Sequence, residues 1–228
     1  MLAPRLPPRS DPASLAVVVQ RSPRRALSTA VKRAMDLAIA SPMLVATLPV
    51  MLAAAAMIAI IDRHSPLYLD DRVGLGGRHF HCWKLRTMRS RPGLVEAYLE
   101  SHPVERDEWL AFRKLKADPR PTALGGFLRK TSVDELPQLV NILRGQMSIV
   151  GPRPISPAEF AQRGTERFAL ASVRPGLTGL WQVQGRSSLD PRQRVMLDSY
   201  YARQWSIAMD LRILLATPGA VFTARGAR

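Results

Sequence analysis

The chain has 228 residues, which is enough for one domain with a sizeable core and hardly enough for two. Its formal net charge of +15 indicates an anionic partner, and composition alone does not decide between nucleic acid, an acidic membrane surface and a phosphorylated substrate. The single cysteine, Cys82, excludes an intramolecular disulfide, so nothing in the sequence requires an oxidising compartment.

Residues 1–31 are rich in proline, arginine and serine, a composition that does not support a packed core, and we expect a flexible basic tail. The chain is then almost wholly apolar over residues 34–61, where Asp36 is the only charge. This run exceeds the roughly 20 residues that a helix needs to cross the hydrocarbon core, and it predicts a membrane helix over residues 32–62. A cleaved signal peptide is less favoured, because the run is too long and begins too late.

Two prolines lie inside the apolar run. Pro42 and Pro49 each remove a backbone donor, and the sequence predicts a kink after Ser41. A helix that enters the bilayer, bends and returns to the same face fits this pattern, and sequence alone does not exclude a spanning helix. Basic residues flank the run on both sides, which is compatible with both ends on the cytoplasmic side: Lys32, Arg33, Arg63, Arg72 and Arg78.

Two short strands are expected after the membrane helix, over residues 67–69 and 80–85, with a glycine-rich turn between them. Residues 94–116 have the pattern of amphipathic helices interrupted at Pro103, which either lie in the membrane interface or pack on the core. Residues 63–228 would form the folded domain that follows the membrane helix. We therefore expect a mainly helical α+β fold with a short β-hairpin.

The most informative motif contains Asp134 and Glu135. Ser132 has capping-box spacing to Glu135, and Pro137 is tolerated only near a first turn, so a helix is expected to begin at Ser132 or Asp134. Its apolar face would be Leu136, Leu139, Val140 and Leu143, with Asp134, Gln138 and Asn141 pointing elsewhere.

Acidic residues in a first helical turn are ordinary, since they interact favourably with the helix dipole by roughly 0.3–1 kcal/mol. The neighbouring cations change the interpretation. Arg129 and Lys130 precede the acid pair, and Arg153 lies between two prolines. Carboxylates surrounded by groups that bind phosphate favour phosphoryl transfer.

Further motifs extend from Lys32 to the C-terminus: Lys32 with Asp36, Ser41-Pro42, Arg72-Val73-Gly74, the block from Lys84 to Met88, Gly151-Pro152-Arg153-Pro154, Arg174-Pro175-Gly176-Leu177-Thr178-Gly179, Trp181-Gln182-Val183, Gly185-Arg186, Asp198, Tyr201, Trp205-Ser206 and Asp210. With these motifs, the chain resembles the small monotopic phosphoglycosyl transferases of the bacterial sugar transferase family, which include ExoY-like priming enzymes of exopolysaccharide synthesis.

The resemblance implies a monotopic protein on the cytoplasmic face of the bacterial inner membrane, with a re-entrant helix broken at Ser41 and Pro42. It implies transfer of a sugar-1-phosphate from a nucleoside-diphosphate sugar, such as a UDP-hexose, to polyprenyl (undecaprenyl) phosphate. Asp134 would be the nucleophile that carries a covalent phosphosugar. Asp134 and Glu135 would hold Mg²⁺, and Glu135 could also orient the nucleophile.

The resemblance also implies a set of residues that bind substrate or phosphate: Lys84, Arg86, Arg129, Arg153, Arg174, Thr178, Asp198 and Asp210. Asp198 has an alternative interpretation as a solvated charge paired with Arg194 on one helix face. Arg174 and Thr178 could simply belong to turns. The sequence departs from the family's pattern at Gln146, where Asp is usual, and at Asp70, where Gln is usual.

Two interpretations without catalysis compete with this one. A nucleic-acid-binding protein would explain the net charge, but the aromatic residues are not interleaved with the basic ones, so no nucleic acid is expected. A membrane-anchored basic interaction protein would explain the apolar run and leaves the acid pair unexplained. His79, His81 and Cys82 are weak evidence for a transition-metal site, and the sequence leaves the oligomeric state open.

Overall fold

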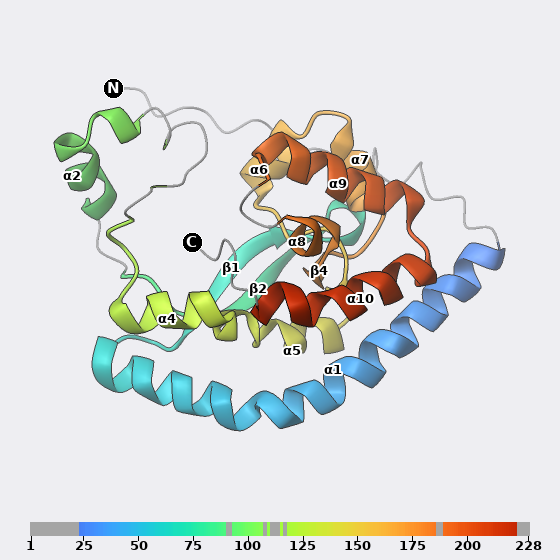
Figure 1. Ribbon diagram of the computed structural model, residues 1–228, viewed down its shortest axis with the longest axis horizontal. Coiled ribbons are helices and arrows are strands. Elements are labelled where there is room, and N and C mark those ends of the chain that lie inside the picture. The colour runs from blue at the N-terminus through green and yellow to red at the C-terminus, as the bar shows by residue number, and fades with distance from the viewer. Residues whose placement is uncertain are drawn as a thin grey trace.

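The structure is a computed structural model that describes residues 23–89, 93–106, 109, 115, 118–185 and 189–222. These residues are mainly helical, and their strands form two small sheets of two strands each. Figure 1 shows the long helix α1 running along one side of the molecule, with α5 and α10 next to it and the strands behind them. The expected mainly helical α+β class is confirmed.

Helix α1 spans Pro23–Met57 and continues as a π-helical turn, η2, over Ile58–Asp62. It begins at Pro23 rather than at Lys32, so the tail expected over residues 1–31 is helical in its last part, and residues 1–22 lie outside the described residues. The helix continues through both prolines, and Figure 1 shows a bent ribbon without interruption. The helix is therefore not interrupted at Ser41 and Pro42, because one proline removes a single helical hydrogen bond and the flanking ones persist.

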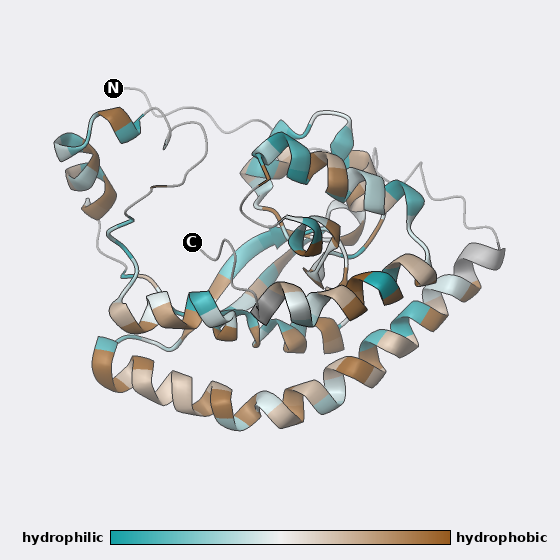
Figure 2. Cartoon of the chain, in the orientation of Figure 1, coloured by the Kyte–Doolittle hydropathy of each residue, from teal (hydrophilic) through white to brown (hydrophobic). Residues whose placement is uncertain are grey.

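The apolar surface of α1 is largely uncovered. From Leu27 to Asp62 the helix is long and apolar enough to cross a membrane, and only 11% of its most apolar stretch is buried. Figure 2 shows hydrophobic residues along its length. A core helix of a soluble protein would bury most of this surface, so the exposure favours contact with lipid.

Polar contacts fasten the first half of α1 to the rest of the protein. Asp36 is 3% exposed, and one carboxylate oxygen accepts hydrogen bonds from Ser148 Oγ at 2.8 Å and from Ile149 N at 2.9 Å. Arg33 donates to the carbonyl oxygens of Ile142 at 2.6 Å and Leu143 at 2.8 Å. The single charge inside the apolar run thus serves to anchor the helix to the domain.

The predicted β-hairpin is confirmed. Strands β1 (Leu67–Val73) and β2 (His79–Leu85) pair in antiparallel register, and a short 3₁₀ turn, η3 (Leu75–Gly77), joins them. Gly76 and Gly77 in this turn have φ values of +68° and +74°, a region that glycine occupies without steric cost. At the ends next to the turn, both strands extend further than the sequence predicted.

The remaining elements follow in chain order: α2 (Leu94–Ser101), α4 (Ala123–Thr131), η4 (Val133–Glu135), α5 (Gln138–Leu143), β3 (Ser148–Val150), α6 (Pro157–Gln162), α7 (Glu166–Ala171), β4 (Gly176–Thr178), α8 (Leu180–Gln184), α9 (Pro191–Gln204) and α10 (Ile207–Phe222). Strands β3 and β4 pair in parallel. No residue of α2 is buried, and the remainder of the amphipathic stretch expected over residues 94–116 lies partly outside the described residues.

The acid pair does not lie where the sequence predicted. Ser132 ends α4 with φ +58°, its backbone N–H bonds to the Arg129 carbonyl, and its side chain forms no capping hydrogen bond. The expected helix start at Ser132 or Asp134 is therefore wrong. Asp134 and Glu135 occupy the separate 3₁₀ turn η4, and α5 begins at Gln138, since proline at 137 lacks the N–H that a continuous helix would use.

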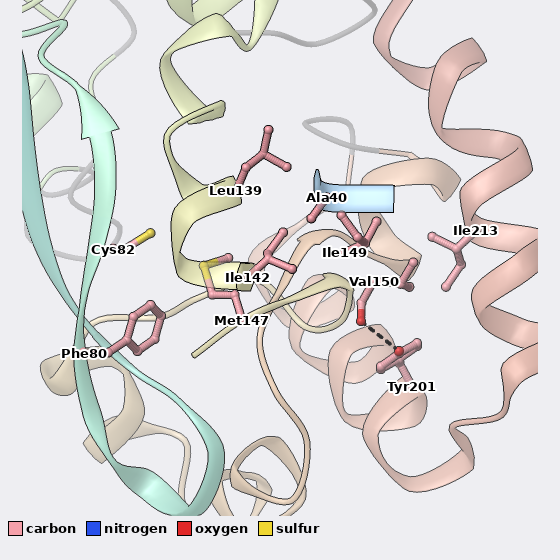
Figure 3. Packing of buried hydrophobic residues seen from close by; sticks show 10 residues of the cluster. All are labelled: Ala40, Phe80, Cys82, Leu139, Ile142, Met147, Ile149, Val150, Tyr201 and Ile213. Atoms are coloured by element: carbon pink, nitrogen blue, oxygen red, sulfur yellow. Dashed lines mark hydrogen bonds between the residues drawn. The ribbon is translucent and has the colours of Figure 1, made fainter. Parts of the chain in front are cut away.

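The described residues form three apolar clusters, of which the smallest joins the hairpin to α6 and α7 through Val73, Phe160 and Ala171. Figure 3 shows the largest one, to which α1, the hairpin, α5, β3, α9 and α10 contribute Ala40, Phe80, Cys82, Leu139, Ile142, Met147, Ile149, Val150, Tyr201 and Ile213. A second cluster joins Ala54 and Ile58 at the end of the long helix to Leu85 and Leu128, with Val133 packed against it. The turn that carries the acid pair is therefore seated on the end of α1.

Candidate active site

Asp134 lies in a partly enclosed environment in the turn between α4 and α5. Burial and the adjacent Glu135 raise the pKa of the Asp134 carboxyl to about 6, and the cations of Lys84 and Arg129 oppose this rise. Asp134 is thus still largely ionised at neutral pH, although it is shielded from water. A carboxylate of this kind is suited to attack an electrophile in a pocket.

A pocket opens beside this turn, and residues from distant parts of the chain line it. They are Lys84, Glu135, Gln138, Arg153, Pro154, Gly176, Leu177 and Gln182. Within it, Arg153 Nη1 lies 3.7 Å from Glu135 Oε1. Of the predicted site residues, the structure therefore brings Lys84, Glu135 and Arg153 into one pocket, next to Asp134 and Arg129.

Close backbone packing sets the position of Arg153. Gly176 N donates to the Pro152 carbonyl at 2.8 Å, so the loop after β3 lies directly on β4. A Cβ atom on Gly151 would lie 2.4 Å from the Arg174 carbonyl oxygen, and one on Gly176 would lie 2.0 Å from Gly151 N. Only glycine allows this approach. Arg153 follows this close contact in the loop, and its side chain is 42% exposed.

A second group of charges lies beside the pocket on the hairpin. The Asp70 carboxylate pairs with Arg72 and lies 3.5 Å from Lys84 Nζ. Arg72 Nη1 also donates to the Pro154 carbonyl at 3.0 Å and lies 3.7 Å from Glu159. These contacts join the hairpin to the loop that carries Arg153.

Asp198, on α9, is 7% exposed. Burial raises the pKa of its carboxyl to about 7, against the pull of the Arg153 and Arg163 cations. The alternative interpretation of Asp198 as a solvated surface charge is therefore wrong. Its proximity to Arg153 associates it with the pocket, although it is not part of the lining.

Three of the predicted binding residues make contacts away from the pocket. Arg86 donates to the Ser65 carbonyl at 2.9 Å. Arg174 donates to the Gly145 carbonyl at 2.8 Å. The hydroxyls of Thr178 and Thr217 lie 2.9 Å apart, joining β4 to α10. These contacts hold neighbouring segments together, and a role for these residues in binding stays a prediction.

Asp210 belongs to a buried polar network instead of the pocket. It is 2% exposed and pairs with Lys32 Nζ at 2.7 Å. Its carboxylate also accepts hydrogen bonds from Tyr201 Oη at 2.6 Å and from Trp205 Nε1 at 2.9 Å. These contacts tie α10 to α9 and to the start of the long helix, which indicates a structural role.

Sequence reasoning missed three polar residues. Gln138 and Gln182 line the pocket, and Asn141, in the same helix as Gln138, is fully buried. Asn141 accepts a hydrogen bond from Trp83 N at 2.9 Å and donates to the His81 carbonyl at 2.7 Å, so it fixes β2 on α5. The sequence did contain a signal for Asn141, because it is a polar residue among the apolar residues of α5. A buried polar side chain requires a hydrogen-bonding partner.

Comparison with known proteins agrees with this geometry. Residues 27–224 match the family model described as bacterial sugar transferase. The chain is 42% identical over 196 residues to exopolysaccharide production protein ExoY of Sinorhizobium fredii, covering 86% of this chain and 87% of that protein. It is 43% identical over 197 residues to a UDP-galactose-lipid carrier transferase of Erwinia amylovora, covering 86% of this chain and 41% of that protein.

A third relative is a UDP-glucose:undecaprenyl-phosphate glucose-1-phosphate transferase of Caulobacter vibrioides, 37% identical over 207 residues, covering 86% of this chain and 71% of that protein. The chain thus spans most of two of these relatives and less than half of the Erwinia protein. The family match favours catalysis over the two interpretations without it. The chain belongs to the bacterial sugar transferase family and is a transferase, as its motifs predicted.

Proposed function

We propose that the protein transfers a hexose-1-phosphate from a nucleoside-diphosphate sugar, a UDP-hexose, to undecaprenyl phosphate or a similar polyprenyl phosphate. This reaction would prime the synthesis of an exopolysaccharide or glycoconjugate. The observation that carries the proposal is the acid turn of Asp134 and Glu135, which faces Lys84 and Arg153 and packs on an exposed apolar helix. The names of the relatives, with UDP-galactose, UDP-glucose and undecaprenyl phosphate, support these substrates.

The proposed chemistry has two displacements at one phosphorus atom. A carboxylate oxygen of Asp134 attacks the phosphorus that bears the sugar, the bond to the oxygen bridging the two phosphates breaks, and UMP leaves with the electron pair. This step produces a phosphosugar esterified to Asp134. An oxygen of the polyprenyl phosphate then attacks the same phosphorus and releases the carboxylate. The products are UMP and a polyprenyl-diphosphosugar.

The protein's contribution would be mainly positioning and charge. Two phosphates carry negative charge that must approach a carboxylate, so cations are needed on several sides. Lys84 and Arg153 line the pocket, and Arg129 lies close enough to lower the pKa of Asp134. Arginine can hold a phosphate through two parallel N–H groups, which suits Arg129 and Arg153 for orienting the donor.

The donor set is compatible with Mg²⁺. In the parts of the chain that the structure describes, no three His, Cys, Asp or Glu side chains gather at one point. Mg²⁺ needs fewer protein ligands, because it keeps several waters and commonly binds one or two carboxylates together with substrate phosphates. Asp134 and Glu135 provide such a pair, and their mutual repulsion contributes to the raised pKa of Asp134. When bound, the ion would neutralise the phosphate charge.

We also propose that α1 is re-entrant in the cytoplasmic face of the bacterial inner membrane, which makes the protein monotopic. The first half of α1 packs on the main core through Ala40, and its end packs on the same domain through Ala54 and Ile58. A helix with both ends on one folded domain cannot readily place those ends on opposite sides of a bilayer. The segment between them exposes Val45, Leu48, Val50 and Leu52. Helix α2, in which no residue is buried, would lie in the membrane interface.

Cysteine labelling tests this topology, because the native Cys82 is fully buried. Cysteine would be introduced at the exposed positions Leu27 and His64, one at each end of the apolar stretch. A membrane-impermeant maleimide should label both sites in inverted vesicles and neither in intact spheroplasts. Labelling of one site from each side would show a spanning helix and contradict the re-entrant topology.

The activity is tested with purified protein, Mg²⁺, undecaprenyl phosphate and UDP-galactose or UDP-glucose labelled in the sugar. Asp134→Asn should lower transfer by about 10³-fold or more, because the amide cannot act as a nucleophile. Asp71→Asn is the control, since Asp71 is exposed on the opposite side of the hairpin and pairs with His79. Without acceptor, the label should remain on denatured wild-type protein and be absent from Asp134→Asn. Full turnover by Asp134→Asn, or RNA binding without turnover, would refute the proposal.

A further inference from the structure

A single carboxylate beside the pocket holds two cations. Asp70 Oδ2 accepts from Arg72 Nε at 2.9 Å and from a second guanidinium nitrogen of the same residue, and it lies 3.5 Å from Lys84 Nζ. All three side chains are between 17% and 18% exposed. The group is therefore shielded from water enough for its charges to interact more strongly than surface pairs do.

The strand pairing places these residues on one face. Asp70 is opposite Cys82 in the hairpin, and Arg72 is opposite Phe80. Lys84 follows Cys82 by two residues, so its side chain projects from the same side of the sheet. Cys82 and Phe80, on this side of the hairpin, belong to the main apolar core. On this face of the hairpin, the Asp70 carboxylate therefore lies between two cations, Arg72 on its own strand and Lys84 on the neighbouring strand.

Each of the two cations reaches a different part of the proposed active site. Lys84 lines the pocket with Glu135 and lowers the pKa of Asp134 through its charge. Arg72 donates to the Pro154 carbonyl, next to Arg153 in the chain. A change at Asp70 would therefore affect both the lysine that faces the acid turn and the loop that presents the arginine.

We propose that Asp70 is a positioning residue for the donor's diphosphate: it holds the Lys84 ammonium in the pocket and fixes Arg72 on the Pro154 carbonyl. This inference rests on the proposed function, because it takes the pocket to receive a nucleoside diphosphate. Asp70 does not touch the reacting atoms. It acts through Lys84, whose flexible stem would otherwise let the ammonium turn to the carboxylates of the acid turn.

Replacement of Asp70 should change the donor KM and kcat through two separate effects, so the positioning role can be measured. Its negative charge weakens the attraction of the pocket for an anionic donor, so Asp70→Asn should lower the donor KM by roughly twofold to fivefold. Loss of the anchor for Lys84 should lower kcat by about tenfold, since small displacements of a catalytic cation are costly. Loss of folded protein alone would lower the apparent kcat and leave KM unchanged.

The experiment measures donor KM and kcat for wild type, Asp70→Asn, Lys84→Met and the double variant, with melting temperatures for each. Asn at 70 keeps an oxygen that accepts from Arg72, so the hairpin should remain folded. Asp71→Asn on the same strand is the matched control and should leave both constants unchanged. In the Lys84→Met background, Asp70→Asn should have little further effect on kcat, because the group it positions is gone, whereas its effect on KM should remain, because the charge of Asp70 acts on the donor directly.

The outcomes separate this inference from the proposed function. If wild type transfers no sugar from any UDP-hexose, the proposed function fails. If wild type is active and Asp70→Asn behaves like Asp71→Asn, or loses kcat with an unchanged KM, the positioning role alone is wrong. Fully additive effects of Asp70→Asn and Lys84→Met on kcat would also overturn it. Opposite changes of KM and kcat in the wild-type background, with the change of kcat alone disappearing in the Lys84→Met background, support it.

Discussion

Loss of one partner from the buried ion pair between Lys32 and Asp210 should destabilise the protein far more than loss of a surface pair. Its atoms are 2.7 Å apart, and the side chains are 14% and 3% exposed. At an effective dielectric constant of about 20, two charges at this distance attract each other by about 6 kcal/mol, and the cost of removing both from water offsets much of that. The intact pair therefore adds little to the free energy of unfolding, whereas loss of one partner lowers that free energy strongly.

Lys32→Met would leave the Asp210 carboxylate buried without a cation. Tyr201 and Trp205 would still donate hydrogen bonds to it, but neither carries a charge. We expect a loss of about 3–5 kcal/mol, the usual cost of an uncompensated buried charge. For a protein of this size that corresponds to a fall of about 10 °C in melting temperature.

Thermal unfolding in detergent, followed by circular dichroism, measures this loss. Glu166→Gln is the control, because it removes a pair with Arg203 in which both side chains are at least 35% exposed, and it should cost less than about 1 kcal/mol. Lys32→Met combined with Asp210→Asn should cost about 2 kcal/mol less than the sum of the single changes. Equal melting temperatures for Lys32→Met and Glu166→Gln would refute the reasoning.

Three further predictions concern pH and packing. Transfer activity should rise with pH through about 6, because Asp134 must be ionised to attack and its pKa is raised to that value; a rate profile flat from pH 5 to 8 would contradict this. The raised pKa of Asp198 means that the folded state holds the proton more tightly, so stability should fall as pH increases from about 4 to about 7. Asp198→Asn should remove the larger part of this dependence, leaving the part that comes from Asp134, and should raise stability above pH 7 by up to about 4 kcal/mol, measurable by unfolding at pH 5 and pH 8. In α4, Gly125→Ala would bring a Cβ atom to 2.0 Å from the Thr87 carbonyl oxygen and should cost about 3 kcal/mol, whereas Gly126→Ala meets nothing within 4 Å and should stabilise by about 1 kcal/mol in the same melting assay.

Local patterns were sufficient where the structure depends on neighbours in the chain. The apolar run of α1, the strands on either side of the glycine turn, and the acid pair flanked by cations could all be located from residue order. The role of Ser132 could not be predicted in this way. Its capping-box spacing indicates a helix start, whereas the structure uses the residue to end α4. Ser132 adopts a left-handed conformation that closes the preceding helix, and local spacing does not reveal which of two helices a residue belongs to.

The sequence by itself determined the class of this protein: a helix apolar enough for a membrane, followed by carboxylates and cations of the kind that phosphoryl transfer requires. Only the tertiary structure decided which polar residues meet. Asp198 and Asp210 look alike in sequence, yet one lies next to Arg153 and the other pairs with Lys32, 178 positions away. Residues so far apart are brought together by packing of α1, α9 and α10 around the core, and no periodicity along the chain encodes that arrangement.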